Sequence, residues 1–150
     1  MAIQVRQLRN NPATNTIAEF LGYSNVFEVE VVASTDNGCE VAFKSNGRRL
    51  RAGAPPANDA KELCVCVRPD DVAVRPLANP EVRADELPQN SIPGDVILAS
   101  FMGSHMQYRV RTGEQEIWEV LSANVASGIR LGSRVAIEID PRHLQVLAKD

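Results

Sequence analysis

The sequence contains no long apolar run and has few cysteine, histidine and aromatic residues. Its 150 residues include three Cys, two His, four Phe, two Tyr and one Trp. No apolar stretch approaches the roughly 20 residues that a membrane-spanning helix needs, and nothing resembles a signal peptide. These absences argue against a membrane-spanning or secreted protein, and we expect a soluble, cytoplasmic chain.

An excess of basic charge is also missing. The chain has 16 basic and 19 acidic residues and a formal net charge of −3, whereas nucleic-acid binding favours a clearly basic face. The aromatic residues that could stack on bases fall in strand-like runs. One dense basic cluster fits a solvated hairpin and its flank; it consists of Lys44, Arg48, Arg49 and Arg51. We therefore expect no nucleic-acid partner.

The cysteines and histidines do not have the spacing of a metal site. Cys64 and Cys66 stand two positions apart on an alternating strand, so they share one face and differ from the C-x-x-C of zinc or redox sites. We interpret them as buried, reduced thiols. His105 and His143 lack the helical or Cys/His spacing of metal ligands. The sequence thus predicts no metal on this chain.

Motifs for nucleotide chemistry and hydrolysis are absent as well. There is neither a G-x-x-x-x-G-K-[ST] phosphate loop nor a G-x-G-x-x-G dinucleotide turn. Ser104 is not in a G-x-S-x-G elbow, and its surroundings read as strand, turn, strand. Asp70 and Asp71 are adjacent, which on a strand places them on opposite faces, and we expect them to cap a turn. We predict no catalytic residue and no bound cofactor.

A repeat is the main positive feature of the chain. Val65–Val74 returns 72 positions later as Ile137–Val146, and each copy reads as an alternating strand, a proline corner and a second short strand. A weaker echo relates Asn25 and the strand after it to Asn90 and the strand after it. Two copies are too few for a solenoid, so we expect two related β units in tandem.

Alternating apolar and polar residues predict five short strands in each unit. In the first unit the runs begin at Val26, and those that follow are 39–44, 48–51, 63–67 and the short strand after the Pro69 corner; in the second unit they are 96–101, 107–111, 116–120, 135–139 and 144–147. Asn11 and Pro12, or Thr16 with Glu19, can start a short helix near residues 12–21, with Ile17, Phe20 and Leu21 on one face.

These elements divide the chain into four parts. We expect a linker helix in residues 1–24, a first half at 25–77, a proline-rich linker at 78–91 and a second half at 92–150. Five short strands with tight turns suit a small closed barrel of the OB type, so the predicted fold is all-β, with tandem OB-like, MOP-like barrels and one short N-terminal helix. A β-sandwich is the alternative.

Three motifs resemble parts of ATP-binding subunits of ABC importers. The first, residues 11–25, resembles the segment that leaves the nucleotide-binding domain. The second, residues 67–72, resembles the R-P-E-D/H-hydrophobic element of the regulatory region that follows, the TOBE or di-MOP domain. The third, residues 94–110, resembles the G-x-V, Y-x-G-S and Y-x-V hairpin of its second half. The resemblance extends over almost the whole chain, from about residue 10 to 148.

The resemblance implies a non-catalytic regulatory and dimerisation domain. In such a parent subunit the tandem barrel packs against its twin, and ATP and Mg²⁺ bind the nucleotide-binding domain of the same subunit. The resemblance also implies a membrane permease as partner, a homodimer, and a cytoplasmic location peripheral to the inner membrane. The transported class stays open among polyamines, iron(III), sugars and oxyanions. The missing ATPase motifs leave two origins, an excised fragment or a separately encoded piece, and Met1 directly before a linker similar to the family's favours the excised fragment.

The alternative is a stand-alone small-oxyanion-binding protein of the molybdate-binding type. Its ligand groups would be backbone amides and polar or cationic side chains near one turn; these are Gly103, Ser104, His105 and Arg109. A plain tight turn is the competing interpretation of Gly103 and Ser104. The repeated corners are predicted to be structural; their residues are Arg68, Pro69, Asp70, Asp140 and Pro141.

Overall fold

The computed structural model describes residues 25–35, 38–54, 62–114 and 116–148. Within these ranges it is all-β, as predicted. The strands are β1 Asn25–Thr35, β2 Gly38–Phe43, β3 Arg49–Ala52, β4 Leu63–Val67, β5 Val72–Pro76, β6 Ser91–Phe101, β7 Met106–Gly113, β8 Glu116–Ser122, β9 Arg134–Ile139 and β10 Gln145–Ala148. No helix in the described ranges is long and apolar enough to cross a membrane. The helix predicted at 12–21 lies outside the described residues.

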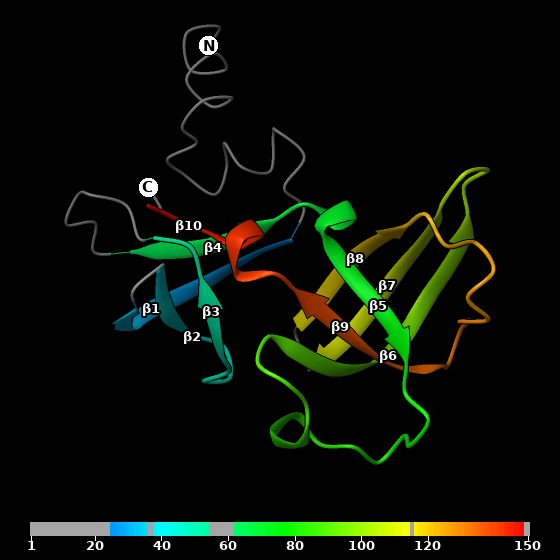
Figure 1. Cartoon of the computed structure of the whole chain (residues 1–150), viewed down its shortest axis with the longest axis horizontal. Coiled ribbons are helices and arrows are strands. Elements are labelled where there is room, and N and C mark those ends of the chain that lie inside the picture. The colour runs from blue at the N-terminus through cyan, green and yellow to red at the C-terminus, as the bar shows by residue number, and fades with distance from the viewer. Residues whose placement is uncertain (1–24, 36–37, 55–61, 115, 149–150) are drawn as a thin grey trace, which may run out of the picture. The chain divides into compact units, whose positions relative to one another are not determined.

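The strands form two sheets with the same pattern of neighbours. The first has the order β10-β4-β1-β2-β3 and the second β5-β9-β6-β7-β8. Two compact units follow this division: residues 1–68 with 141–150, and residues 69–140. In Figure 1 the red β10 lies beside the green β4, although the two strands are far apart in the sequence.

Each repeat contributes its last strand to the other sheet. β5 follows β4 in the chain, yet it pairs with β9, while β10 follows β9 and pairs with β4. The units therefore differ from the contiguous halves expected at 25–77 and 92–150. The repeat predicts a strand after each corner, but a corner that turns the chain away from one sheet leaves its following strand free to complete another.

The register of the first sheet explains its core. Val29 pairs with Phe43, and Val41 pairs with Leu50; all four side chains are buried. Phe27 also stacks on Phe43, with ring centroids 5.2 Å apart. Since paired residues in an antiparallel ladder share a face, the alternating apolar positions of β1, β2 and β3 collect on one side of the sheet.

The second sheet has an equivalent core. Val110 pairs with Trp118 and Tyr108 pairs with Val120 across β7 and β8, and all four side chains are at most 1 % exposed. Both sheets also contain a bulge near the middle of their long strand, between Val31 and Ala33 in β1 and between Val96 and Leu98 in β6. Such bulges bend a strand and increase its twist, which helps each sheet to curl.

The edges of each sheet meet, which favours barrels over the alternative β-sandwich. In the second unit β5 and β8, at opposite edges of the sheet, contact each other. In the first unit the amide of Gly53, next to β3, donates to the carbonyl of Leu144, next to β10, at 2.9 Å. The predicted OB-like architecture is thus confirmed.

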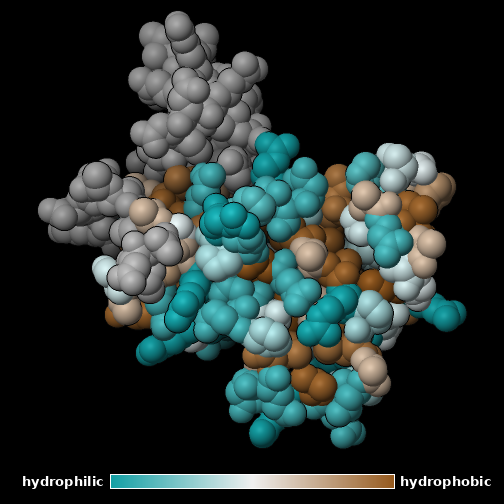
Figure 2. Space-filling view, in the orientation of Figure 1, coloured by the Kyte–Doolittle hydropathy of each residue, from teal (hydrophilic) through white to brown (hydrophobic). Residues whose placement is uncertain are grey.

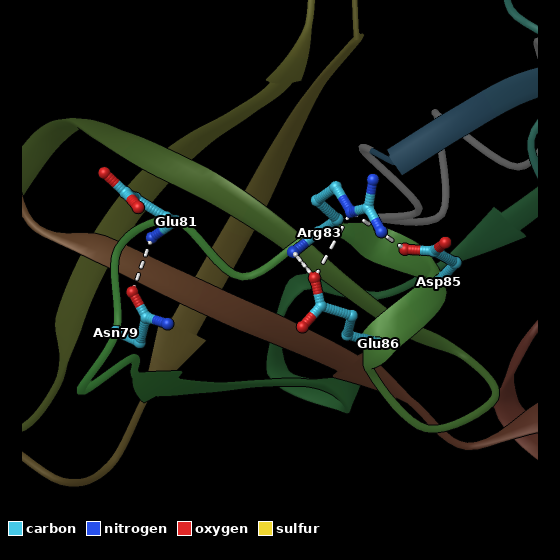
Figure 3. A network of polar contacts seen from close by, with 5 residues as sticks. All are labelled: Asn79, Glu81, Arg83, Asp85 and Glu86. Atoms are coloured by element: carbon cyan, nitrogen blue, oxygen red, sulfur yellow. Dashed lines mark hydrogen bonds and ion pairs between the residues drawn. The ribbon is translucent and has the colours of Figure 1, made fainter.

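The segment between β5 and β6 lies wholly within the second unit, so it connects strands of one unit rather than the two units. Figure 3 shows the polar contacts that shape it. The amide of Glu81 donates to Asn79 Oδ1 at 3.0 Å, and Arg83 Nε lies 3.3 Å from Glu86 Oε1 and 3.6 Å from Asp85 Oδ1. A 3₁₀ turn, Ala84–Glu86, follows Arg83.

Strand β6 begins at Ser91, five residues before the predicted start at Val96. In this part of β6 the strand pairs only with β9, and β7 joins from Asp95 onward, so a proline is tolerated as it is at a sheet edge. Gly94 is required by close packing, because an added Cβ would lie 2.6 Å from Val110 Cγ1 and 2.8 Å from the carbonyl oxygen of Arg111.

Candidate functional site

The turn between β6 and β7 contains three of the four predicted ligand residues. Gly103 has φ +89°, a left-handed conformation that favours glycine, and the amide of Met102 donates to the carbonyl of His105 at 2.7 Å. The side chains of Ser104 and His105 are hydrogen-bonded to each other, with Oγ 2.8 Å from Nδ1. The turn projects into solvent, and no atom lies within 4 Å of a Cβ added at Gly103.

Arg109, the fourth predicted ligand residue, is engaged elsewhere. Its Nε lies 2.7 Å from Oε1 of Glu119, the residue that pairs with it on β8. Gln107 Nε2 donates to the other oxygen of the same carboxylate at 3.4 Å. Arg109 lies four positions after His105, which corresponds to about 13 Å of extended strand. The structure thus places Arg109 with Glu119 rather than with Ser104.

Two exposed apolar side chains lie at the start of this turn. Phe101 and Met102 are 64 % and 57 % exposed. Hydrophobic surface is visible among the hydrophilic side chains in the space-filling view of the second unit (Figure 2). Two large exposed apolar residues in a row at a hairpin tip are more typical of a contact surface than of an anion site.

The two proline corners have equivalent places in the fold. Each forms a 3₁₀ turn, Pro69–Asp71 (η1) and Pro141–His143 (η3), 72 positions apart. η1 contacts β8 and η3 contacts β3, and these two strands hold the same position in their sheets. The chain passes from the first unit to the second between Arg68 and Pro69, and returns between Asp140 and Pro141.

A buried carboxylate is the polar group that the sequence reading missed. Glu116, on β8, is 2 % exposed. Its Oε2 accepts hydrogen bonds from the Thr112 hydroxyl and from Trp118 Nε1, the latter at 3.2 Å. The alternation of residues along β8 could have revealed it, because Glu116 lies on the same face of the strand as the buried Trp118 and Val120. These two hydrogen bonds lie within the β7–β8 hairpin, so they stabilise the second core.

All three cysteines are free and buried, as the sequence predicts. Burial raises the pKa of the Cys39 thiol, and burial together with the neighbouring Cys64 raises the pKa of Cys66 to about 12. These thiols are therefore protonated and unreactive at neutral pH. In the described part of the chain, no three His, Cys, Asp or Glu side chains lie together as metal ligands would.

The TOBE domain model matches residues 65–147, more than half of the chain. The chain belongs to the TOBE domain family. The resemblance noted from the three motifs is therefore confirmed. The match begins in β4, includes both proline corners and ends in β10, so it covers the whole second unit and the two strands that pair in the first.

ATP-binding proteins of importers are similar to this TOBE chain over most of its length. An "Fe(3+) ions import ATP-binding protein FbpC" of Brucella suis biovar 1 is 28% identical over 142 residues, covering 95% of this chain and 36% of the relative. The protein of that name from Agrobacterium fabrum is 29% identical over 107 residues, covering 71% of this chain and 27% of the relative. A "Spermidine/putrescine import ATP-binding protein PotA" of Rubrobacter xylanophilus is 29% identical over 143 residues, covering 91% of this chain and 34% of the relative. The chain spans about a third of these curated relatives.

A solved structure supports the fold. The cytoplasmic molybdate-binding protein ModG, crystallised with molybdate bound, superposes with a TM-score of 0.63 at 13% identity, covering 83% of this chain and 96% of that one. At this identity the likeness concerns the fold alone. It agrees with the tandem barrels that the strand orders describe.

Proposed function

We propose that this TOBE chain is a non-catalytic regulatory and dimerisation domain of the ATP-binding subunit of an ABC-type importer. The observation that carries the proposal is the family match together with the importer relatives, which align with up to 95% of the chain. The domain acts beside a nucleotide-binding domain of the same subunit, which binds ATP and Mg²⁺. Through that subunit it joins a membrane permease, in the cytoplasm at the inner membrane.

The polar contacts of the described residues support a binding role rather than a catalytic one. Arg109 and Glu119 neutralise each other on the outside of the second sheet, while Glu116 is saturated by donors of its own hairpin. Exposed apolar side chains, Phe101 and Met102 among them, are open to a partner. The cargo is proposed to belong to the iron(III) or polyamine class, which the relatives' names state for those proteins, with sugars and oxyanions as further classes to test.

The regulatory role is tested by a fusion. The chain is joined behind the nucleotide-binding domain of an Fe(3+) import relative, and ATP hydrolysis is compared with that of the same domain alone and of a fusion to an unrelated β-domain of similar size. We expect a change in hydrolysis rate or in dimerisation that the unrelated domain does not cause. Equal rates and equal sedimentation for all three proteins would overturn the proposal.

Dimerisation is tested on the chain by itself. We expect sedimentation equilibrium to give twice the mass of one chain at micromolar concentration. Replacing Phe101 and Met102 by Ser removes exposed apolar surface without touching the core, so it should weaken the dimer if this tip contributes. A monomer over the whole concentration range would contradict self-association of the isolated domain.

Oxyanion binding at the β6–β7 turn is the second candidate function, supported by the likeness in fold to a molybdate-binding protein. It is tested by calorimetric titration with molybdate, tungstate and sulfate. Heat that is lost in both Ser104→Ala and Arg109→Gln would favour this function. No heat with any of the three anions would exclude it at this turn.

A further inference from the structure

Three exposed asparagines of the described residues share one local geometry. In each, the side-chain Oδ1 accepts a hydrogen bond from the backbone amide two positions later, which is the Asx turn that asparagine favours. The donors are the amide of Arg48 to Asn46 at 2.9 Å, that of Glu81 to Asn79 at 3.0 Å (Figure 3) and that of Ala126 to Asn124 at 3.2 Å.

The residue after each asparagine decides whether the turn can react with itself. The pairs are Asn46 with Gly47, Asn79 with Pro80 and Asn124 with Val125. The reaction is an attack by the next backbone nitrogen on the side-chain Cγ, so this nitrogen must carry a hydrogen and be accessible. Pro80 has no N–H, and the β-branched Val125 crowds its own amide. Gly47 has no side chain, and no atom lies within 4 Å of a Cβ added to it.

We propose that Asn46 is a site of spontaneous deamidation in the turn between β2 and β3. The Gly47 nitrogen gives its proton to hydroxide from the solvent and bonds to Cγ of Asn46, while Oδ1 takes up the negative charge. The Cγ–Nδ2 bond then breaks, and Nδ2 takes a proton from water and leaves as ammonia. A water molecule opens the cyclic imide at either carbonyl, which gives aspartate or isoaspartate. One water is consumed for each ammonia released, and nothing is oxidised or reduced.

Two hydrogen bonds of the turn act on this reaction in opposite directions. The Arg48 amide already donates to Oδ1 of Asn46, and a donor at a developing oxyanion stabilises the transition state. The Gly47 amide, however, donates to the Phe43 carbonyl at 2.8 Å, which holds its proton in place. The attack therefore follows local opening of this second bond, and an exposed turn opens at a small cost in free energy.

The product changes the hairpin that contains it. Isoaspartate adds one carbon to the main chain at position 46, inside the two bonds that close the turn. These are Gly47 N–H to the Phe43 carbonyl at 2.8 Å and Phe43 N–H to the Arg48 carbonyl at 2.7 Å. Since β3 pairs with β2 directly after this turn, the modification should loosen β3. This chemistry is independent of the proposed importer function.

Ageing of the full chain at pH 8 and 37 °C tests the proposal, with conversion followed by peptide mass spectrometry that distinguishes isoaspartate from aspartate. Digestion after glutamate separates Asn46 from Asn37, which also precedes a glycine and lies outside the described residues. We expect Asn46 to convert roughly tenfold faster than Asn124, because glycine leaves its amide uncrowded and valine does not. Equal rates at Asn46 and Asn124, or aspartate without isoaspartate at position 46, would overturn the proposal.

A matched variant tests the role of the following residue. Val125 is 48 % exposed, so Val125→Gly gives Asn124 the same neighbour as Asn46 without disturbing the core. We expect conversion of Asn124 to accelerate about tenfold, with Asn46 unchanged. An unchanged rate at Asn124 would show that the following residue does not select the site.

The effect on the hairpin is measured by hydrogen exchange. After ageing, the original chain should lose amide protection in β3, whereas Asn46→Gln, which keeps a side-chain amide but forms the cyclic imide far more slowly, should retain it. Equal loss of protection in the two aged proteins would overturn the link between Asn46 and β3.

Discussion

Glu116 shows how a buried charge can be part of a barrel core. Its carboxylate lies on the core face of β8 and accepts from Thr112 and Trp118. Burying a carboxylate without partners would cost several kcal/mol. Here the two donors compensate for the lost water, and the indole N–H and the threonine hydroxyl are satisfied by the same group. The three residues therefore depend on one another.

Removing the carboxylate should cost more than changing its charge. In Glu116→Ala the Trp118 N–H and the Thr112 hydroxyl lose the carboxylate as acceptor, although the Thr112 hydroxyl keeps the backbone carbonyl of residue 116 at 3.3 Å. Each hydrogen bond lost from a buried group costs about 1–3 kcal/mol. Urea unfolding should therefore show a loss of about 2–5 kcal/mol. Glu116→Gln keeps one acceptor oxygen in place and should lose less than half as much. Equal losses in the two variants would show that the hydrogen bonds are not the source of the stability.

Cys66 makes stability sensitive to alkaline pH. Its pKa is about 12 in the folded chain, raised by burial and by Cys64, and about 8.5 in an unfolded chain. Between these values the unfolded state has lost the proton and the folded state still holds it, so stability falls as the pH rises. Above pH 9 the free energy of unfolding falls by about 1.4 kcal/mol per pH unit because of this one thiol.

Cys66→Val removes this contribution while keeping an apolar side chain of similar size. We expect the stability of the original chain to fall more steeply than that of the variant between pH 8 and pH 10.5, as measured by urea unfolding at each pH. Lys and Tyr titrate equally in both proteins, so they cancel in the difference. Parallel curves would show that Cys66 is not buried to the extent that its environment indicates.

At the scale of the strands, the exchange of β5 and β10 has a direct test. Val72 of β5 is 3 % exposed in the second unit, and Val146 of β10 is 4 % exposed in the first. Val146→Asp should lower amide protection in β4, to which β10 is paired, and leave β9 protected. Val72→Asp should do the reverse, loosening β9 and sparing β4. Hydrogen exchange followed by mass spectrometry resolves these strands, and the two variants are controls for each other.

The opposite pattern would contradict the exchange. If Val146→Asp loosened the strand that precedes it in the sequence, β9, then β10 would belong to the second sheet. The paired substitutions are equivalent in size, charge and burial, so a general loss of stability would lower protection in both sheets and would not produce a reciprocal result.

Most strands could be predicted from the sequence, because alternation of apolar and polar residues is a local signal. β4 was predicted at its observed bounds, and the Ser45–Gly47 turn is confirmed by the Gly47 amide donating to Phe43 at 2.8 Å. The partners of the strands could not be predicted in this way. Pairing depends on contacts across the chain, and both β5 and β10 carry the same pattern.

The candidate site shows the same division between local and long-range information. The left-handed Gly103 follows from its place in a turn, since few other residues adopt that conformation. The ion pair of Arg109 with Glu119 depends on the register between β7 and β8, which one sequence does not specify. Ligand binding by Gly103, Ser104, His105 and Arg109 therefore stays a prediction.

At the scale of the whole molecule, the two repeats have been adapted to different surroundings. Equivalent outer positions carry the exposed Arg75–Glu138 ion pair in one unit and buried Cys66 with Leu147 in the other. An exact duplication would have produced identical faces. The equivalent outer positions therefore differ in charge and in exposure between the two units.

The order of the strands also predicts which pieces of the chain can fold alone. Residues 69–140 contain every strand of the second sheet, from β5 to β9, although they join the end of one repeat to most of the other. Residues 78–150 are longer by one residue and contain the second repeat in full, but they lack β5. Without it, β9 becomes an open edge and the buried Val72 is missing from the core.

We therefore expect the 69–140 fragment to unfold cooperatively on heating, with a near-ultraviolet circular dichroism signal from the buried Trp118. A domain of this size is of marginal stability, so the comparison is made at 10 °C. The 78–150 fragment should lack that signal or associate through its open edge. If 78–150 folded as a monomer while 69–140 did not, the fold would be organised by repeats rather than by exchanged strands.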